Sequence, residues 1–199
     1  KGTQHASADI LANKMLANLN SDAYSTTKIL EWSFRGKHHY KWYKQEDKVE
    51  VSWDVNKVIL YTKNHEKSII YIDGIETKNT ELLNKAIGYF NNDSFWLIAP
   101  YKVFDSGTER SIVKHNNKDA LLITYKSGGS TPGDSYLWIL DDNFIPIAYK
   151  MWVGIIPIGG KGATWNNWIT TDTGCKLPTT HTLTSFGMEI DMGTVKAYN

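Results

Sequence analysis

Apolar and polar residues alternate along residues 31–43, which read EWSFRGKHHYKWY. One set of alternate positions carries Trp32, Phe34, Gly36, His38, Tyr40 and Trp42, and the other set is mainly charged or polar. Successive side chains of a strand point to opposite faces, so the pattern predicts one long β-strand with an aromatic face. At about 3.3 Å per residue, that face would extend for roughly 30 Å. A sheet with such a face must bury it against helices or keep part of it as a cavity for an apolar molecule.

Two other segments have a helical period. The first runs from about Ala8 to Asn20, with Ser7 as the expected N-cap and an apolar stripe along one side. The second begins at Thr80, and the NND sequence at 91–93 is expected to end it. Both helices need an apolar surface on which to lie.

Short alternating or apolar runs predict further strands, joined by turn signals such as Asp73-Gly74. They are KVEVSWDV (48–55), KVILYT (57–62), SIIYI (68–72), RSIVKH (110–115), ALLITYK (120–126), SYLWIL (135–140), IPIAYKMWV (145–153), ATWNNWIT (163–170), THTLTSF (180–186) and MEIDM (188–192). About ten strands with two helices predict an α+β fold: a large curved antiparallel sheet that forms an incomplete β-barrel. The N-terminal and central helices would cover its concave face, and residues 1–199 would form one domain.

Charge and composition exclude several classes of function. The 22 basic and 21 acidic residues nearly cancel and form no long run, so nucleic acid is not expected as a partner. The most apolar stretch, near Val153 to Ile158, is too short to cross a bilayer. The first residues, KGTQHASAD, do not read as a secretory signal, which we expect to be absent from this chain. Cys175 stands alone, which excludes an internal disulfide.

Three stretches carry a resemblance to a known family: ILANKML (10–16), SYLWILDDNFIPIAYKMW (135–152) and TGCKLPTTHTLT (173–184). With the order of elements, they resemble the LolA/LolB-like fold of bacterial envelope lipoprotein carriers, and uncharacterised envelope proteins that share it. The resemblance implies an incomplete barrel that shelters acyl chains, and a periplasmic or outer-membrane-associated location. The many Trp residues on the predicted sheet depart from these carriers and count against a triacylated lipoprotein as the ligand.

Aromatic residues on the predicted inner face are the candidate ligand-binding residues. They are Trp32, Phe34, Tyr40, Trp42, Trp53, Trp138 and Trp152, together with His38. His38 shares the register of the apolar side, and a buried imidazole needs hydrogen-bond partners. It is either a structural histidine bonded to a Tyr or to the backbone, or the polar contact that orients a ligand.

The sequence VGIIPIGGKGATW at 153–165 frames three isoleucines with glycines and a proline. One interpretation is a hairpin tip that packs against a neighbouring segment. The other is an apolar lip at the barrel mouth, in which Ile155, Ile156 and Ile158 contact a membrane or gate ligand entry.

No motif predicts catalysis, a metal or a cofactor. His38 and His39 would point to opposite faces of a strand, and the other histidines lack ligand spacing. Cys175 lies in a predicted turn, and no nucleophile elbow or phosphate-binding loop is present. Asp141 and Asp142 fit a hairpin turn better than a hydrolase pair.

The sequence therefore predicts a protein that binds or carries a lipid or other apolar molecule in the cell envelope and is not an enzyme. An envelope protein or a membrane surface would be its further partner. The alternative is a protein-interaction or assembly module whose interior is filled and free of ligand. An enzyme whose catalytic residues converge only in space is the third possibility.

Overall fold

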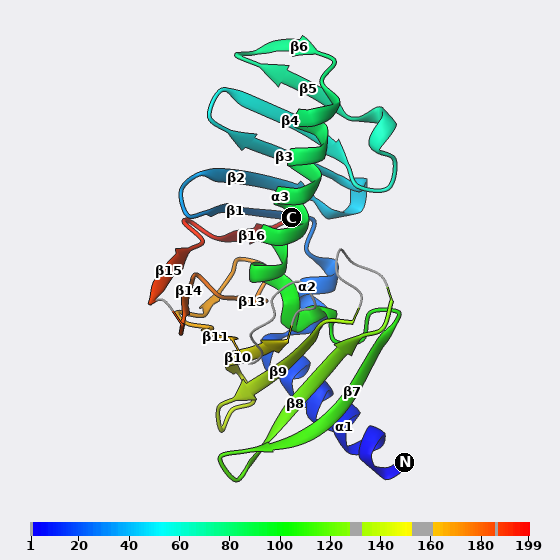
Figure 1. Ribbon diagram of the computed structural model, residues 1–199, viewed down its shortest axis with the longest axis vertical. Helices are drawn as coiled ribbons and strands as arrows, with labels where there is room; N and C mark the ends of the chain where they lie inside the picture. Colours follow the sequence, from blue (N-terminus) through cyan, green and yellow to red (C-terminus); the bar gives the residue numbers. More distant parts are fainter. Residues whose placement is uncertain (1, 128–132, 153–160, 186) are drawn as a thin grey trace. The chain divides into compact units, whose positions relative to one another are not determined.

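In a computed structural model, residues 2–127, 133–152, 161–185 and 187–199 are described, with side chains from residue 6 onward (Figure 1). The chain forms two compact units. Unit one contains Lys1–Ser21, Ile98–Trp168 and Thr180–Ile190, and unit two contains Asp22–Leu97, Ile169–Thr179 and Asp191–Asn199. Helices accompany antiparallel sheets throughout, so the predicted α+β class is confirmed. The single domain stays a prediction.

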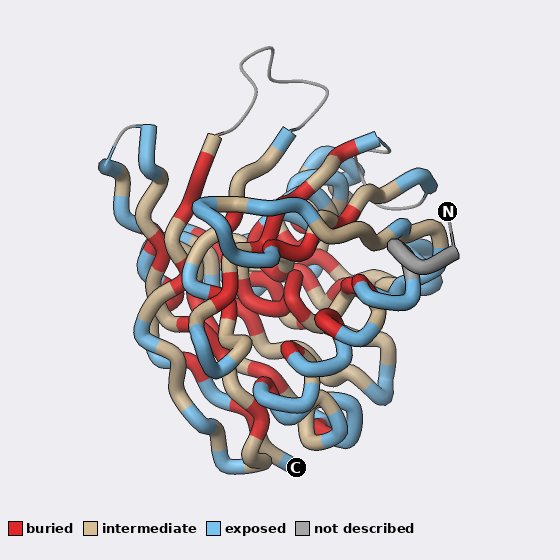
Figure 2. The backbone as a smooth tube through the Cα atoms, turned by 90° about the horizontal axis from the view of Figure 1, so that it is seen from below, coloured by how far each residue is buried: buried red, intermediate tan, exposed pale blue. Residues whose placement is uncertain are grey.

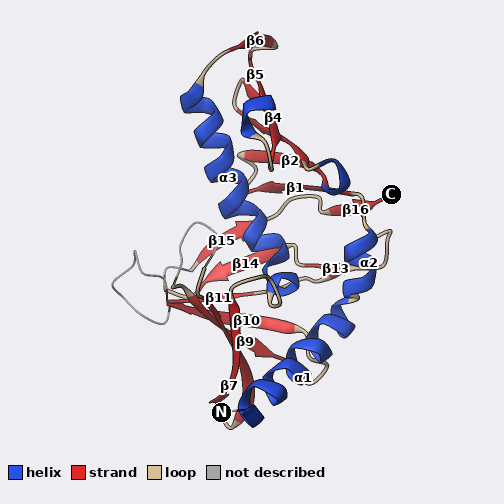
Figure 3. Cartoon of the chain, turned by 90° about the vertical axis from the view of Figure 1, so that its right-hand side faces the viewer, coloured by secondary structure: helices blue, strands red, loops and turns tan. Residues whose placement is uncertain are grey.

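Unit one is built on a seven-stranded sheet in the order β15-β14-β11-β10-β9-β8-β7. Its elements are α1 (Gly2–Leu19), the 3-10 helix η3 (Ala99–Lys102), β7 (Thr108–His115), β8 (Lys118–Tyr125), β9 (Ser135–Leu140), β10 (Pro146–Trp152), β11 (Lys161–Thr164), β14 (Thr180–Leu183) and β15 (Met188–Asp191). The helix α1 lies along β7 (Figure 3) and buries an apolar stripe that includes Leu11, Met15 and Leu19. The predicted N-terminal helix is thus confirmed and begins earlier, at Gly2.

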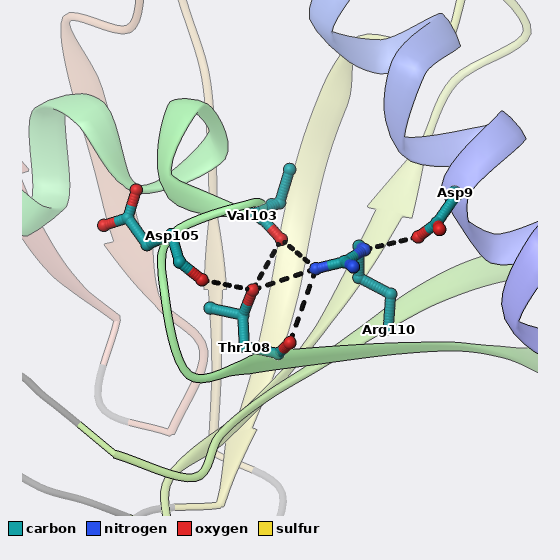
Figure 4. Close-up of polar contacts among 5 residues, drawn as sticks. All are labelled: Asp9, Val103, Asp105, Thr108 and Arg110. Atoms are coloured by element: carbon teal, nitrogen blue, oxygen red, sulfur yellow. Dashed lines mark hydrogen bonds and ion pairs between the residues drawn. The ribbon is translucent and has the colours of Figure 1, made fainter.

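A polar network fastens α1 to β7 in unit one (Figure 4). The Arg110 guanidinium donates through Nε to the Asp9 carboxylate, and through Nη1 to the Val103 carbonyl at 3.0 Å and the Thr108 hydroxyl at 2.9 Å. The Thr108 hydroxyl in turn donates to the carbonyl of Asp105 at 2.8 Å. Because the guanidinium binds to α1 and to the residue after η3 at once, it fixes the helix on its strand.

Unit two is built on a second seven-stranded sheet, in the order β16-β1-β2-β3-β4-β5-β6. Its elements are α2 (Ser21–Thr26), β1 (Ile29–Phe34), β2 (His38–Tyr43), η1 (Lys44–Glu46), β3 (Lys48–Trp53), β4 (Asn56–Tyr61), η2 (His65–Lys67), β5 (Ile69–Ile72), β6 (Ile75–Thr77), α3 (Thr80–Ile98), β12 (Ile169–Thr170), β13 (Lys176–Leu177) and β16 (Lys196–Tyr198). The short strands β12 and β13 pair with each other as a third sheet. Figures 1 and 3 show α3 along one face of the seven-stranded sheet.

The sequence predicts one large sheet of about ten strands, whereas the strands of the structure form two seven-stranded sheets and one two-stranded sheet. Both seven-stranded sheets are open, with β16 and β6 at the edges of one and β15 and β7 at the edges of the other. Buried and less buried residues alternate along the strands (Figure 2), as in β3, where Val49, Val51 and Trp53 are buried. The two helices are divided in the same way, since α1 lies in unit one and most of α3 in unit two.

The prediction of one long strand at 31–43 is wrong, because this segment is the hairpin of β1 and β2. The chain reverses at Arg35 and Gly36, which have φ of 54° and 64°. Positive φ at both central positions suits the tight turn that joins twisted strands. Phe34 then pairs directly with His38, and Trp32 with Tyr40. Direct partners in a hairpin point to the same face of the sheet. The aromatic residues predicted to share a face therefore do share one, although they lie on two strands and not on one.

The predicted end of the central helix at 91–93 is also wrong. The helix α3 continues through these residues to Ile98, and η3 follows it. Asn and Asp are weak helix formers because their side chains compete for backbone hydrogen bonds. Asp93 does not compete in this way, because its carboxylate accepts hydrogen bonds from the sheet. A tertiary contact has therefore overridden a local stop signal.

Candidate functional site

A buried carboxylate on α3 meets two side chains of β2 in unit two. The Asp93 oxygen Oδ2 lies 2.7 Å from Nδ1 of His38 and accepts a 2.5 Å hydrogen bond from the Tyr40 hydroxyl. The other oxygen, Oδ1, accepts a hydrogen bond from the Asn92 side-chain amide at 2.8 Å. We call His38, Tyr40 and Asp93 the polar triad.

Burial makes the polar triad an electrostatic feature as well as a structural one. The Asp93 side chain is 2% exposed and the His38 side chain 19% exposed. A buried carboxylate is costly unless several hydrogen-bond partners satisfy it, and His38, Tyr40 and Asn92 are the partners of Asp93. Burial, followed by the nearby Asp93 charge and hydrogen bond, raises the pKa of the Tyr40 hydroxyl well above its usual range. Tyr40 therefore stays a donor throughout the physiological pH range.

Aromatic rings of unit two surround the triad and fill the space between α3 and the sheet. The ring of Tyr89 stacks on the His38 imidazole with centroids 3.9 Å apart, and meets Trp53 edge-on at 5.5 Å. Its neighbour Phe90 contacts Trp42 edge-on at 5.1 Å. Phe90 also lies 6.4 Å from both Trp32 and Tyr40, which stack on each other at 4.5 Å. Two adjacent rings of α3 thus cover the aromatic face.

Unit two therefore brings six of the eight predicted ligand-binding residues to one sheet, in β1, β2 and β3. Trp32, Tyr40 and Trp53 are buried, whereas Phe34, His38 and Trp42 are partly exposed. The indole nitrogen of Trp32 is buried and has no hydrogen-bond partner among the described residues. Whether these residues hold a ligand stays a prediction.

The other two predicted residues, Trp138 and Trp152, belong to unit one. Trp138 is fully buried in a cluster with Tyr149 at 5.3 Å and Trp165 at 4.9 Å, both edge-on. Trp152, at the end of β10, is 42% exposed. The eight residues therefore do not form one continuous surface on one sheet. The proposed lip residues Ile155, Ile156 and Ile158 lie outside the described residues.

The expectation for His38 is corrected in part. The sequence predicts a structural histidine bonded to a Tyr or to the backbone, or a contact to a ligand. Its partner is instead the Asp93 carboxylate, which Tyr40 shares. Nothing in the spacing of the sequence points to Asp93, because 55 residues separate it from His38. The available signal was an acidic residue on the same helical face as Ala86 and Phe90, which are both buried.

The polar triad holds α3 on β2 and orients the His38 imidazole. An imidazole oriented by a carboxylate can act as a base, but catalysis also needs a reacting group within hydrogen-bond reach. The rings of Tyr89 and Phe34 flank this imidazole instead. Among the residues that the structure describes, no group of three or more His, Cys, Asp or Glu side chains could hold a metal ion. Cys175 is buried, with its Sγ 3.2 Å from the Thr171 hydroxyl.

Two pockets in unit one flank the turn between β9 and β10, with volumes of about 440 and 520 Å³. Neither pocket is lined by any of the eight predicted ligand-binding residues. In the described part of the chain, no helix is both long and apolar enough to cross a membrane.

No family model and no curated protein matches the sequence. Among solved structures, the chain is similar to a DUF1329 family protein from Desulfovibrio piger, at 11% identity and a TM-score of 0.51, over 98% of this chain and 93% of that one. It is also similar to a domain from Vibrio parahaemolyticus that is described as an outer membrane lipoprotein-sorting protein, at 10% identity and a TM-score of 0.43, over 94% and 93%. The similarity to the Desulfovibrio piger structure confirms the expected fold. A similarity of this kind concerns architecture and not activity.

Proposed function

We propose that the chain binds and carries an apolar molecule, a lipid or an acyl chain, on the aromatic face of β1, β2 and β3, and that it is not an enzyme. The observation that carries the proposal is the ring layer itself. Trp32, Tyr40, Trp42 and Trp53 share one face, and a single helix covers them through Tyr89 and Phe90. A surface of this kind favours apolar ligands with few polar contacts.

Binding on this face requires α3 to move, because Tyr89 and Phe90 occupy the space that an acyl chain would take. An apolar ligand would replace the contacts of these two rings with little change in free energy. The rings and the ligand each gain about 25 cal/mol per Å² of apolar surface that they bury. The polar triad opposes the movement, because lifting α3 would break the bonds of Asp93 to His38 and Tyr40. The ligand is therefore expected to exchange with α3 and not to enter an open cavity.

The proposal includes a location in the cell envelope, periplasmic or associated with the outer membrane. The resemblance of residues 10–16, 135–152 and 173–184 to envelope carriers supports this part. An envelope protein or a membrane surface would deliver or receive the ligand. Fractionation of cells that express the natural gene tests the location, and recovery from the cytoplasm would contradict it.

The test of ligand binding uses the variant Phe90→Ala, which removes the ring that contacts Trp32, Tyr40 and Trp42. We expect lipid to co-purify with the wild type and, at a higher molar ratio, with this variant, as measured by mass spectrometry after solvent extraction. Phe104→Ala, at a 41% exposed position of unit one, is the control and should match the wild type. If Phe90→Ala fails to fold, Phe90→Leu takes its place. Absence of lipid from the wild type and from a folded Phe90 variant would overturn the proposal.

A second candidate function is an interaction or assembly module with a filled interior. The close packing of Tyr89 against His38 and Trp53 favours it. The exposed side chains Val55, Ile72 and Ile75 also favour it, because they lie on neighbouring hairpin ends that the bond from the Asp73 N–H to the Val55 carbonyl joins at 2.8 Å. Concentration-dependent association in sedimentation experiments, lost in Ile75→Ser, together with a lipid-free protein, would support this function.

A further inference from the structure

The pocket that α1 lines in unit one has the composition of a ligand site. Its volume of about 440 Å³ lies within the range of small-molecule sites, about 300–1,000 Å³. One wall is a single face of α1, formed by Ser7, Ile10, Leu11 and Lys14, which recur at helical spacing. The opposite wall comes from β7, the β7–β8 hairpin, the end of β9 and the following turn, and consists of Ile112, Lys118, Asp119, Leu140, Asp141, Asp142 and Phe144. Five of these eleven residues are apolar: Ile10, Leu11, Ile112, Leu140 and Phe144.

Both walls are held in place by polar contacts outside the pocket lining or at its edge. The bond from Arg110 to Asp9 fixes α1 beside Ile10 (Figure 4). In the turn, the Asp141 carboxylate accepts hydrogen bonds from the N–H groups of Asn143 at 2.9 Å and Ile145 at 2.8 Å. A pocket with fixed walls does not need to be ordered when a ligand binds, which reduces the entropic cost.

An aromatic ring is held at this pocket at a conformational cost. Phe144 has a φ of 60°, in the left-handed region that a bulky side chain rarely adopts. The surrounding structure must offset the free-energy cost of holding such a residue. The side chain nevertheless lines the pocket, and Ile10 on α1 stays 59% exposed. An exposed Ile beside a constrained Phe leaves apolar surface that an acyl chain would cover.

Each charged side chain that lines the pocket has an ion-pair or hydrogen-bond partner among the described residues, except Lys14. Asp119 pairs with Lys114 at 2.7 Å, and Asp142 pairs with Lys118 at 2.7 Å. The Asp141 carboxylate is satisfied by the two N–H groups of its turn. Among the described residues no carboxylate forms an ion pair with Lys14, whose Nζ lies 5.0 Å from the centroid of the Phe144 ring.

We propose that this pocket binds a monoanionic amphiphile of the fatty acid class, with the carboxylate at Lys14 and the chain along Ile10, Leu11, Ile112 and Leu140. Lys14, the lining cation without an ion-pair partner among the described residues, selects the head group, and the apolar wall of α1 selects the tail. All of these residues belong to unit one. The proposal therefore does not depend on ligand binding beneath α3.

The test is a titration of the whole chain with dodecanoate, below its micelle concentration, followed by calorimetry. We expect one molecule bound per chain, with Lys14→Gln weakening the affinity about threefold, as for an exposed ion pair. Ile10→Ser should weaken it about fivefold, because an aliphatic contact is lost. Both side chains are exposed, so neither change should prevent folding. Lys37→Gln, at an exposed position of unit two, is the matched control and should bind as the wild type does.

The location of binding separates this proposal from the one above. Amide shifts on dodecanoate binding should fall in residues 7–14 and 140–144, and should persist in Phe90→Ala. Shifts confined to β1, β2 and β3 would overturn the α1 site while supporting the aromatic face. Dodecyltrimethylammonium that binds more tightly than dodecanoate would show that the three carboxylates, and not Lys14, set the preference. That result would overturn the proposal. So would equal dodecanoate affinity of Lys14→Gln and the wild type, or the absence of dodecanoate binding.

Discussion

The imidazole Nδ1 of His38 lies 2.7 Å from Oδ2 of Asp93, although the two residues are 55 positions apart in the chain. The same oxygen accepts the hydrogen bond of Tyr40. One carboxylate therefore joins α3 to β2 at the centre of an otherwise aromatic contact, and any movement of the helix away from the sheet must break both bonds.

Replacing Asp93 should be costly for stability. In Asp93→Asn the charge is lost, and one amide oxygen must serve both His38 and Tyr40. We expect the free energy of unfolding to fall by about 2–4 kcal/mol, because a buried polar network loses its acceptor. Urea unfolding measures this change. Asn91→Ala, at an exposed position of the same helix, is the control and should stay within about 0.5 kcal/mol of the wild type. Equal midpoints for the two variants would contradict the role of Asp93.

The raised pKa of Tyr40 predicts a loss of stability in alkali. Above pH 10, the usual pKa of tyrosine, the side chain in the unfolded chain releases its proton while the buried Tyr40 retains it. The folded state then binds more protons, so stability must fall as the pH rises. Unfolding in urea at pH 9, 10 and 11 should show this fall, and Tyr40→Phe should make it shallower. The same slope in both proteins would show that Tyr40 does not contribute.

The lowered pKa of Lys44 predicts that stability rises with pH, in a lower range of pH than for Tyr40. Its amine donates to the Tyr24 carbonyl, lies 3.7 Å from the Tyr24 ring centroid, and has a pKa that burial lowers to about 8 from 10.5. Between these two values the unfolded chain binds more protons, so stability should rise with pH. Measured from pH 8 to 10, the wild type should gain stability relative to Lys44→Met. A titration of the Lys44 amine by NMR near pH 10.5 would contradict this prediction.

Gly193 should not tolerate a side chain. Its φ is 63°, and an added Cβ would lie 2.2 Å from Oγ and 3.3 Å from Cβ of Ser33. We expect Gly193→Ala to lower the free energy of unfolding by about 2–3 kcal/mol, from backbone strain and overpacking together. Ser33→Ala in the same chain should restore part of the loss, because it removes the closer clash.

Gly36→Ala is the matched control for this change. Gly36 has a nearly equal φ of 64° but has no atom within 4 Å of an added Cβ. It should therefore show the conformational cost alone, about 1 kcal/mol. Thermal or urea unfolding of the three variants and the wild type compares the two costs. Equal losses at Gly36 and Gly193 would mean that the contact with Ser33 is unimportant.

The aromatic face could be predicted from the sequence even though the element that carries it could not. The alternation from Trp32 to Trp42 predicts one strand and gives no sign of the turn at Arg35 and Gly36. The alternation nevertheless predicts the residues that share this face, because Phe34 and His38 are direct partners across the hairpin. A period of two is preserved when a strand folds back in this register.

Local periods of two and 3.6 residues are enough to predict which side chains share a face and where most strands and both long helices lie. The sequence by itself could not determine that Asp93 continues a helix, because the donors that satisfy its carboxylate come from a distant hairpin. Nor could it assign Lys14 to a pocket with Leu140 and Phe144. Such contacts depend on how elements pack, and local propensity carries no information about partners that are far away in the chain.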